Sequence, residues 1–77
     1  MKRTGLRFHR VTYHAGMHTG TAWTAVIGGV PIGRWDRHTL GGSWVETADG
    51  RAVHVYLRDW RAACWAEATA RAAVDAA

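Results

Sequence analysis

Residues 23 to 44 bring together side chains of the types that bind nucleic acids. They are arginines, tryptophans and one histidine, namely Trp23, Arg34, Trp35, Arg37, His38 and Trp44. Arginine interleaved with aromatic residues on a sheet can contact phosphates, stack on bases or fork onto guanine. Tryptophan is also a favoured core residue. We therefore expect at least three of the five tryptophans to pack in the core, and Trp35 or Trp65 to be exposed.

A second group of basic residues lies at the amino terminus. Lys2, Arg3, Arg7 and Arg10 precede the first acid, and six arginines balance six acids from residue 11 onward, so this segment carries the whole net charge of +4. Arginine suits phosphate and guanine recognition. The fourteen alanines offer another reading, because a GC-rich genome favours both alanine and arginine codons.

The histidines and the single cysteine lack the spacing of a metal site. His14 and His18 stand four residues apart, a spacing that binds zinc when both side chains project from one helix face. Gly16 lies between them in a stretch that reads as loop, and Cys64 is distant in the sequence. We therefore expect no bound metal and no other cofactor.

No pattern in the chain is typical of an enzyme. The six acids are scattered, and serine, histidine and aspartate do not recur at a catalytic spacing. Gly28, Gly29 and Gly33 do not lead into a helix, so they indicate a hairpin turn and not a phosphate-binding loop. We expect a non-catalytic protein.

Length and composition bound the class of protein. A chain of 77 residues forms one domain, which buries only about 60% of its unfolded surface. The lone Cys64 reads as a buried apolar residue in a reducing compartment, which predicts a cytoplasmic location. No window approaches the roughly 18 apolar residues of a membrane span, and the basic amino terminus lacks a signal peptide's apolar region. No membrane partner is expected.

A hairpin over residues 21–37 must position the arginine and tryptophan side chains. Gly28 and Gly29 supply the positive φ angles that a tight turn requires. That turn sets the cross-strand pairs, which are Ile27 with Val30, Ala25 with Ile32, Trp23 with Arg34, and Ala22 with Trp35. This register places Trp23 and Trp35 on opposite faces of the sheet. It also predicts a cation–π contact between Trp23 and Arg34.

Further strands flank this hairpin. Residues 6–13 predict an edge strand with a bulge near His9 and Arg10, because the apolar positions change parity there. We expect loops over 16–20 and 37–42. A second hairpin is expected from strands 43–47 and 52–56 around an Asp49–Gly50 turn.

Residues 58–75 predict the one helix, because they lack glycine and proline and are rich in strong helix formers. Its apolar stripe recurs at three- and four-residue steps, at Leu57, Trp60, Cys64 and Ala68. We expect Trp60 and Cys64 to be buried against the hairpin residues Ile27, Val30 or Ile32.

The predicted fold class is therefore α+β. It is an antiparallel sheet of about four strands in two hairpins, over residues 6–57, packed by the carboxy-terminal helix. Residues 1–5 form a basic flexible arm, and residues 1–77 form a single domain.

The order of these elements resembles that of a known family. The strand pattern Gly29-x-x-Ile32-Gly33-x-Trp35, a further hairpin, and a helix entered through residues 57–63 resemble the small DNA-binding modules of the AP2 and phage-integrase arm-binding type. Such modules read the major groove with a three-stranded antiparallel sheet backed by one carboxy-terminal helix. The resemblance covers residues 21–70 in outline and implies Arg34, Trp35 and Arg37 as contacts. The acids Glu46 and Asp49 depart from the pattern. The chain also resembles short reading frames of actinobacteria and their phages.

These observations predict a small nucleic-acid-binding protein, regulatory or phage-related, with duplex DNA as the favoured partner. The expected phosphate contacts are Lys2, Arg3, Arg7 and Arg10, with Arg34, Trp35 and Arg37 facing the groove. The alternative is a protein-binding module, such as a phage-encoded inhibitor of a host protein or a homodimerising domain. Arginines on one uncovered sheet face favour nucleic acid, whereas an apolar patch of several hundred Å² there favours a protein partner.

Overall fold

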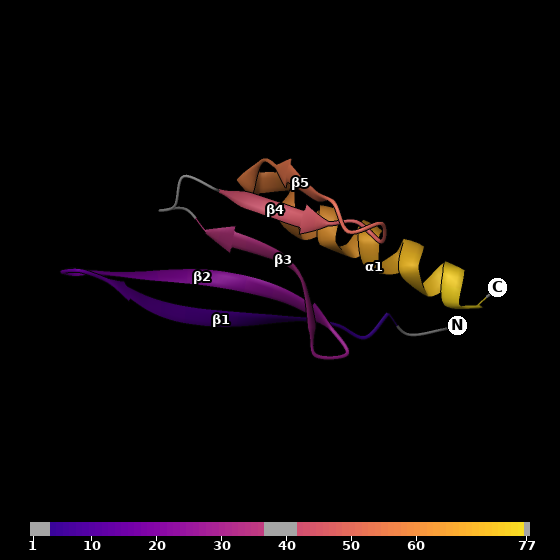
Figure 1. Cartoon of the computed structure of the whole chain (residues 1–77), viewed down its shortest axis with the longest axis horizontal. Coiled ribbons are helices and arrows are strands. Elements are labelled where there is room, and N and C mark those ends of the chain that lie inside the picture. Colours follow the sequence, from indigo (N-terminus) through magenta and orange to yellow (C-terminus); the bar gives the residue numbers. More distant parts are fainter. Residues whose placement is uncertain (1–3, 37–41, 77) are drawn as a thin grey trace.

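The computed structural model describes residues 4–36 and 42–76 and shows one antiparallel sheet of five strands. The strands lie side by side in chain order, so each joins its neighbour as a hairpin (Figure 1). They are β1 (Leu6–Ala15), β2 (His18–Ile27), β3 (Val30–Asp36), β4 (Ser43–Glu46) and β5 (Ala52–Val55). The expected antiparallel sheet is confirmed, with five strands in place of about four.

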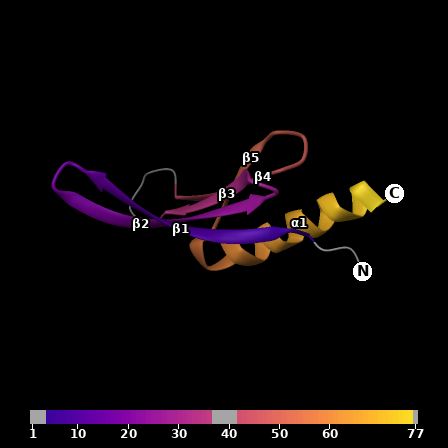
Figure 2. The same cartoon turned by 90° about the horizontal axis from the view of Figure 1, so that it is seen from below.

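A single helix completes the fold. A 3-10 turn, η1 (Leu57–Asp59), leads into α1 (Trp60–Ala76), and α1 packs on one side of the sheet only (Figure 2). The α+β class is therefore confirmed. The β1–β2 hairpin extends well beyond the helix, and the molecule measures 49 × 20 × 20 Å.

The core lies between α1 and the middle of the sheet. Its buried residues are Ala25, Ile32, Val45, Trp60 and Cys64. Trp60 and Cys64 pack against Ile32 and the half-buried Ile27, as expected, whereas Val30 is 59% exposed and takes no part. The expected burial of Trp60 and Cys64 is therefore confirmed through two of the three alternatives, and Val30, which adjoins the Gly28–Gly29 turn, is not the one used.

Gly33 lets the helix approach the sheet closely. A Cβ atom at Gly33 would lie 2.9 Å from the Trp44 carbonyl oxygen, 3.2 Å from Cys64 Sγ and 3.3 Å from Trp60 Nε1. The Trp60 indole also donates a hydrogen bond of 3.0 Å to the Trp44 carbonyl. The absence of a side chain at Gly33 therefore makes room for the tryptophan that anchors α1.

The register of the β2–β3 hairpin differs from the expected one. Ile27 pairs with Val30 and Val26 with Pro31, but a bulge then shifts the ladder so that Trp23 pairs with Trp35 and Thr24 with Arg34. Proline cannot donate to the ladder, which is why strand prolines occur at bulges. Trp23 and Trp35 consequently lie on the same face, and the expected pairs Ala25–Ile32, Trp23–Arg34 and Ala22–Trp35 were wrong.

The first hairpin is longer and more regular than expected. The β1–β2 register runs without a break from Leu6 opposite Ile27 to Ala15 opposite His18, so the expected bulge at His9 and Arg10 is absent. The chain reverses at Gly16 and Met17, and residues 18–20 are strand and not loop. The parity change that suggested a bulge has another cause, because Phe8 faces the helix whereas Val11 and Tyr13 lie on the other face of an unbroken strand. The edge position of β1 is confirmed.

The helix stripe is confirmed except at its start. Trp60, Cys64 and Ala68 are at most 2% exposed, whereas Leu57 lies in the 3-10 turn and is 40% exposed. Trp65 is 45% exposed, which fits the expectation for one exposed tryptophan. Burial raises the pKa of the Cys64 thiol to about 11.

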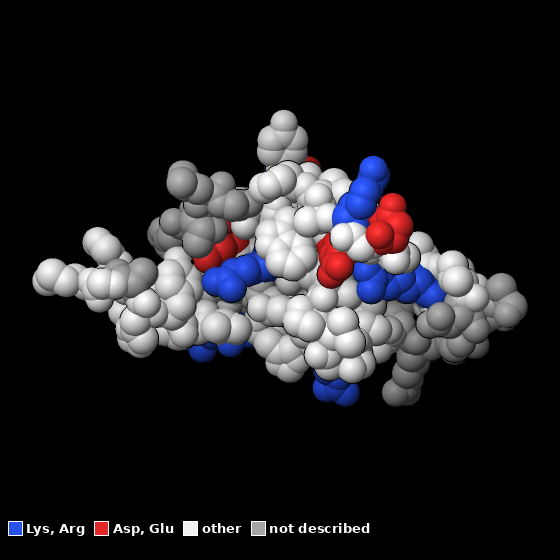
Figure 3. Space-filling view, viewed as in Figure 1, with Lys and Arg blue, Asp and Glu red and all other residues white. Residues whose placement is uncertain are grey.

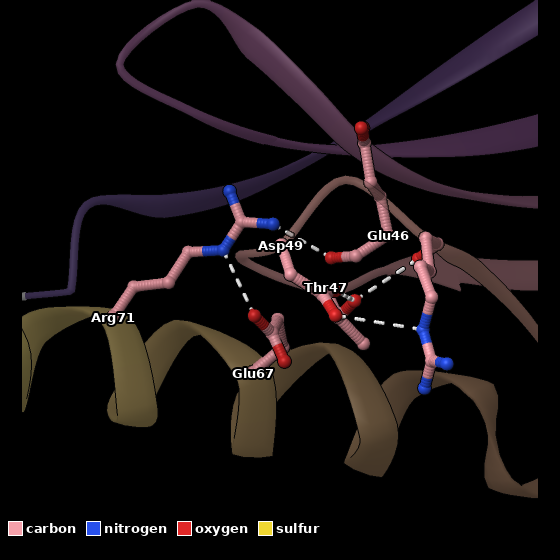
Figure 4. A network of polar contacts seen from close by, with 6 residues as sticks. Glu46, Thr47, Asp49, Glu67 and Arg71 are labelled. Atoms are coloured by element: carbon pink, nitrogen blue, oxygen red, sulfur yellow. Dashed lines mark hydrogen bonds and ion pairs between the residues drawn. The ribbon is translucent and has the colours of Figure 1, made fainter.

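A polar network fixes the β4–β5 turn to α1 (Figure 4). Arg71 Nε contacts Glu67 Oε1 at 3.0 Å, and Arg71 Nη2 donates to the Glu46 carbonyl at 2.6 Å. Within the turn, the Thr47 hydroxyl contacts Asp49, and its hydrogen bond is the main cause of the lowered pKa of that carboxyl. The expected Asp49–Gly50 turn is confirmed by the hydrogen bond from Gly50 N to the Thr47 carbonyl.

Candidate functional site

One row of side chains crosses the face of the sheet that α1 leaves uncovered. Successive residues of a strand point to opposite faces, and directly paired residues share a face. The core residues Ala25 and Val45 face the helix, so their neighbours Thr24 and Trp44 face away from it. Following the register across the sheet gives the row, which is His9, Thr24, Arg34, Trp44 and His54. We call it the cross-strand row.

The row has one member on each strand and a regular spacing. Neighbouring strands lie about 4.8 Å apart, so the row spans about 19 Å from β1 to β5. His9 and His54 at its ends are exposed, whereas the three central residues are half-buried by their neighbours. Arg7, two residues before His9 on β1, extends the same face with a further exposed basic group.

Arg34 at the centre of the row is held by a buried carboxylate. Its Nη2 atom lies 3.3 Å from Asp36 Oδ2, and the Arg34 side chain remains 41% exposed while that of Asp36 is fully buried. The Tyr13 hydroxyl donates to Asp36 Oδ1 at 3.2 Å. A carboxylate that is buried and hydrogen-bonded on both oxygens fixes the position of the guanidinium beside it.

Tyr13 reaches Asp36 because a glycine lies beneath its ring. Gly20 is the cross-strand partner of Tyr13, and a Cβ atom at Gly20 would collide with that ring. Burial raises the pKa of the Tyr13 phenol, and the hydrogen bond and charge of Asp36 raise it further. The phenol therefore keeps its proton for the hydrogen bond that orients Asp36.

The electrostatics of this side of the molecule are mixed. Basic and acidic side chains lie next to one another among uncharged residues (Figure 3). Glu46, two residues after Trp44, points its side chain away from the helix (Figure 4). The face therefore carries arginine, histidine and tryptophan beside a few acids, together with apolar side chains such as Val11 and Val26.

The structure separates the residues expected to bind nucleic acid. Arg7 and Arg34 share the uncovered face. Arg10 and Trp35 lie on the helix side, because Arg10 pairs with Trp23 and Trp23 pairs with Trp35. Adjacent residues of a regular strand cannot face the same way, so Arg34 and Trp35 do not reach one surface together. Lys2, Arg3 and Arg37 lie outside the described residues.

Sequence reasoning missed His9, Thr24 and His54 as members of one surface. These three residues lie on different strands, so placing them on one face requires the correct register of every strand pair between them. An error of one residue in any register moves a side chain to the other face of the sheet. The sequence could have placed them only by asking which residue of each strand lies on the same face as Trp44. That question can be answered only with the correct register across all five strands.

His14 and His18 do not form a metal pair. His14 pairs with Thr19, and its Nδ1 lies 3.3 Å from the Thr19 hydroxyl, whereas His18 pairs with Ala15 and so lies on the opposite face. Within residues 4–36 and 42–76, no three histidine, cysteine or acidic side chains are placed to share a metal ion. Over the same residues, no helix has both the length and the apolar character needed to cross a bilayer.

Comparison with known proteins gave no relative from which a role could be transferred. No protein-family model, no curated protein and no solved structure matches this chain.

Proposed function

We propose that this chain is a small, non-catalytic regulatory protein that binds duplex DNA through the uncovered face of its sheet. The observation that carries the proposal is the cross-strand row, which places arginine, tryptophan and histidine in register on a face that no helix covers. Arginine and aromatic side chains on a sheet suit phosphate and base contacts.

The dimensions of the row suit the major groove. The three central strands, β2 to β4, span about 10 Å, and the major groove is about 12 Å wide. Thr24, Arg34 and Trp44 would therefore enter the groove. His9 and His54 on the outer strands would lie over the two phosphate backbones, with Arg7 beside His9.

Arg34 is the residue best suited to read a base. Arginine can donate two parallel hydrogen bonds to O6 and N7 of guanine, which is the commonest specific contact in DNA complexes. Asp36 already holds one nitrogen of the Arg34 guanidinium, so the remaining donors are directed before DNA binds. Glu46 on the same face can accept from a cytosine amino group.

The position of the helix behind the sheet also supports DNA binding by the sheet. The AP2 and phage-integrase modules that the sequence resembles read the major groove with a sheet backed by a carboxy-terminal helix. Here α1 lies behind the sheet relative to the cross-strand row (Figure 2). A regulatory or phage-related role remains part of the proposal.

The test is a fluorescence-anisotropy titration of labelled duplex DNA at about 50 mM salt, where a cationic protein gives measurable affinity. Arg34→Gln should weaken binding to a preferred sequence by about 1–3 kcal/mol. Arg51→Gln is the matched control, because Arg51 lies in the exposed β4–β5 turn and pairs with Asp49. No association with duplex or single-stranded DNA by the parent protein would refute the proposal.

A second candidate function rests on the outer edge of the sheet. β1 is a ten-residue edge strand whose residues contain no proline, and Trp65 is 45% exposed on the helix. Such an edge can accept a further strand from a partner protein or from a second copy. Sedimentation equilibrium separates these cases, because self-pairing gives a concentration-dependent dimer whereas binding to another protein leaves a monomer.

A further inference from the structure

A small cavity on the helix side of the sheet is lined largely by indole rings. It has a volume of about 210 Å³ and is bounded by Trp23, Trp35, Leu57, Trp60 and Arg61. Trp23 and Trp35 are cross-strand partners on β2 and β3, while the other three residues come from η1 and the first turn of α1. The cavity therefore lies on the opposite side of the sheet from the cross-strand row.

Basic groups accompany the indoles at this cavity. The guanidinium of Arg61 lies 4.4 Å from the centroid of the Phe8 ring, which holds it beside the sheet. Arg10 pairs with Trp23 on β1 and so faces the same side. Among residues 4–36 and 42–76, none of those that line the cavity is acidic. The lining thus combines three tryptophans with positive charge, and Trp23 and Trp35 are the two whose side chains are only half-buried.

The size of the cavity limits its occupant. Sites for drug-sized ligands have volumes of about 300–1,000 Å³, so a smaller cavity accommodates a single planar ring system. Nucleobases stack on tryptophan regardless of base type, and arginine binds phosphate through parallel hydrogen bonds. A neutral apolar side chain would use the indoles but leave Arg61 without a partner of opposite charge.

We propose that this cavity binds the base of an unpaired nucleotide, with Arg61 contacting the phosphate. The nucleotide can be free or can belong to a single strand, because the base and phosphate are the same in both. The proposal does not depend on duplex binding by the cross-strand row, since the two surfaces lie on opposite sides of the sheet.

The indole N–H signals in a nitrogen-15 NMR spectrum test the proposal directly. Deoxythymidine monophosphate at millimolar concentration should shift the Trp23 and Trp35 indole signals in a saturable way. Trp44 and Trp65 serve as internal controls, because neither lines the cavity. Thymidine should bind at least about tenfold more weakly than the monophosphate, and inorganic phosphate alone should not shift the indole signals.

Paired arginine variants test the role of the charge. Arg61→Gln should weaken binding of the monophosphate at least about tenfold and leave the affinity for thymidine unchanged. Arg58→Gln is the matched control, because Arg58 is exposed on η1, lies over Tyr56 and does not line the cavity. A thermal melt of each variant confirms that both are folded when they are compared.

The outcomes separate the possibilities. A short oligothymidylate that shifts the same two indole signals at lower concentration than the monophosphate identifies single-stranded nucleic acid as the source, and equal affinities identify the free nucleotide. Equal affinity for thymidine and its monophosphate would overturn the proposal in favour of an apolar pocket. Absence of any shift at Trp23 and Trp35 would also overturn it. A duplex that shifts only Trp44 would support the function proposed for the cross-strand row without bearing on this cavity.

Discussion

The two faces of this sheet are built from the same strands but differ in which side chains they can accommodate. On the helix side, the register joins Phe8, Ala25, Gly33, Val45 and Val53, which we call the core row. Each member of the core row is a direct chain neighbour of a member of the cross-strand row. Contact with Trp60 and Cys64 limits the centre of the core row to small or apolar residues. In the part of the chain that the structure describes, no helix covers the other face, so polar and aromatic side chains can remain there for a partner.

Removal of the helix anchor should have the largest effect on this arrangement. Trp60→Ala deletes a side chain that is 2% exposed and donates to the Trp44 carbonyl, and we expect it to lower the free energy of unfolding by about 3–5 kcal/mol. Trp65→Ala is the control, because Trp65 is 45% exposed. Chemical denaturation of both variants measures the difference. Equal losses would show that Trp60 does not anchor α1.

A substitution to alanine should destabilise the protein more in the core row than in the cross-strand row. Gly33→Ala adds a Cβ where three heavy atoms of Trp44, Cys64 and Trp60 lie within 3.3 Å, so we expect a loss of about 1–3 kcal/mol. Thr24→Ala, on the other face, should cost less than about 1 kcal/mol. The midpoints of urea unfolding give both values. A harmless Gly33→Ala would mean that α1 lies farther from the sheet than described.

A smaller effect is expected from alkaline pH. The buried Cys64 thiol has a pKa of about 11 against an ordinary value of 9.0, so the folded state holds its proton more tightly than the unfolded state. Stability from this group is present below pH 9 and is lost as the pH rises to 11. The raised pKa of Tyr13 acts in the same direction above pH 10. The free energy of unfolding of Cys64→Ala should therefore fall less steeply between pH 9 and 11 than that of the parent. Identical slopes of the free energy against pH would contradict burial of the thiol.

The chain's local patterns predicted the elements but not the faces. The turn glycines at 28–29 and 50 correctly gave two hairpins, and the stripe of Trp60, Cys64 and Ala68 gave the helix, because these signals act over a few residues. The face of a strand residue depends on every pairing between it and the helix. The bulge after Pro31 moved Trp35 to the helix side, and the unbroken β1 register put His9 in the cross-strand row.

The comparison of Arg7 with Arg10 is the most direct measurement of which face binds DNA. Both are exposed residues of β1, three positions apart, and they lie on opposite faces. Arg7→Gln should raise the dissociation constant for duplex DNA and reduce the slope of log K against log salt by about 0.9, the value for one lost phosphate contact. Arg10→Gln should leave that slope unchanged. A larger loss of affinity and slope for Arg10→Gln than for Arg7→Gln would contradict duplex binding by the uncovered face.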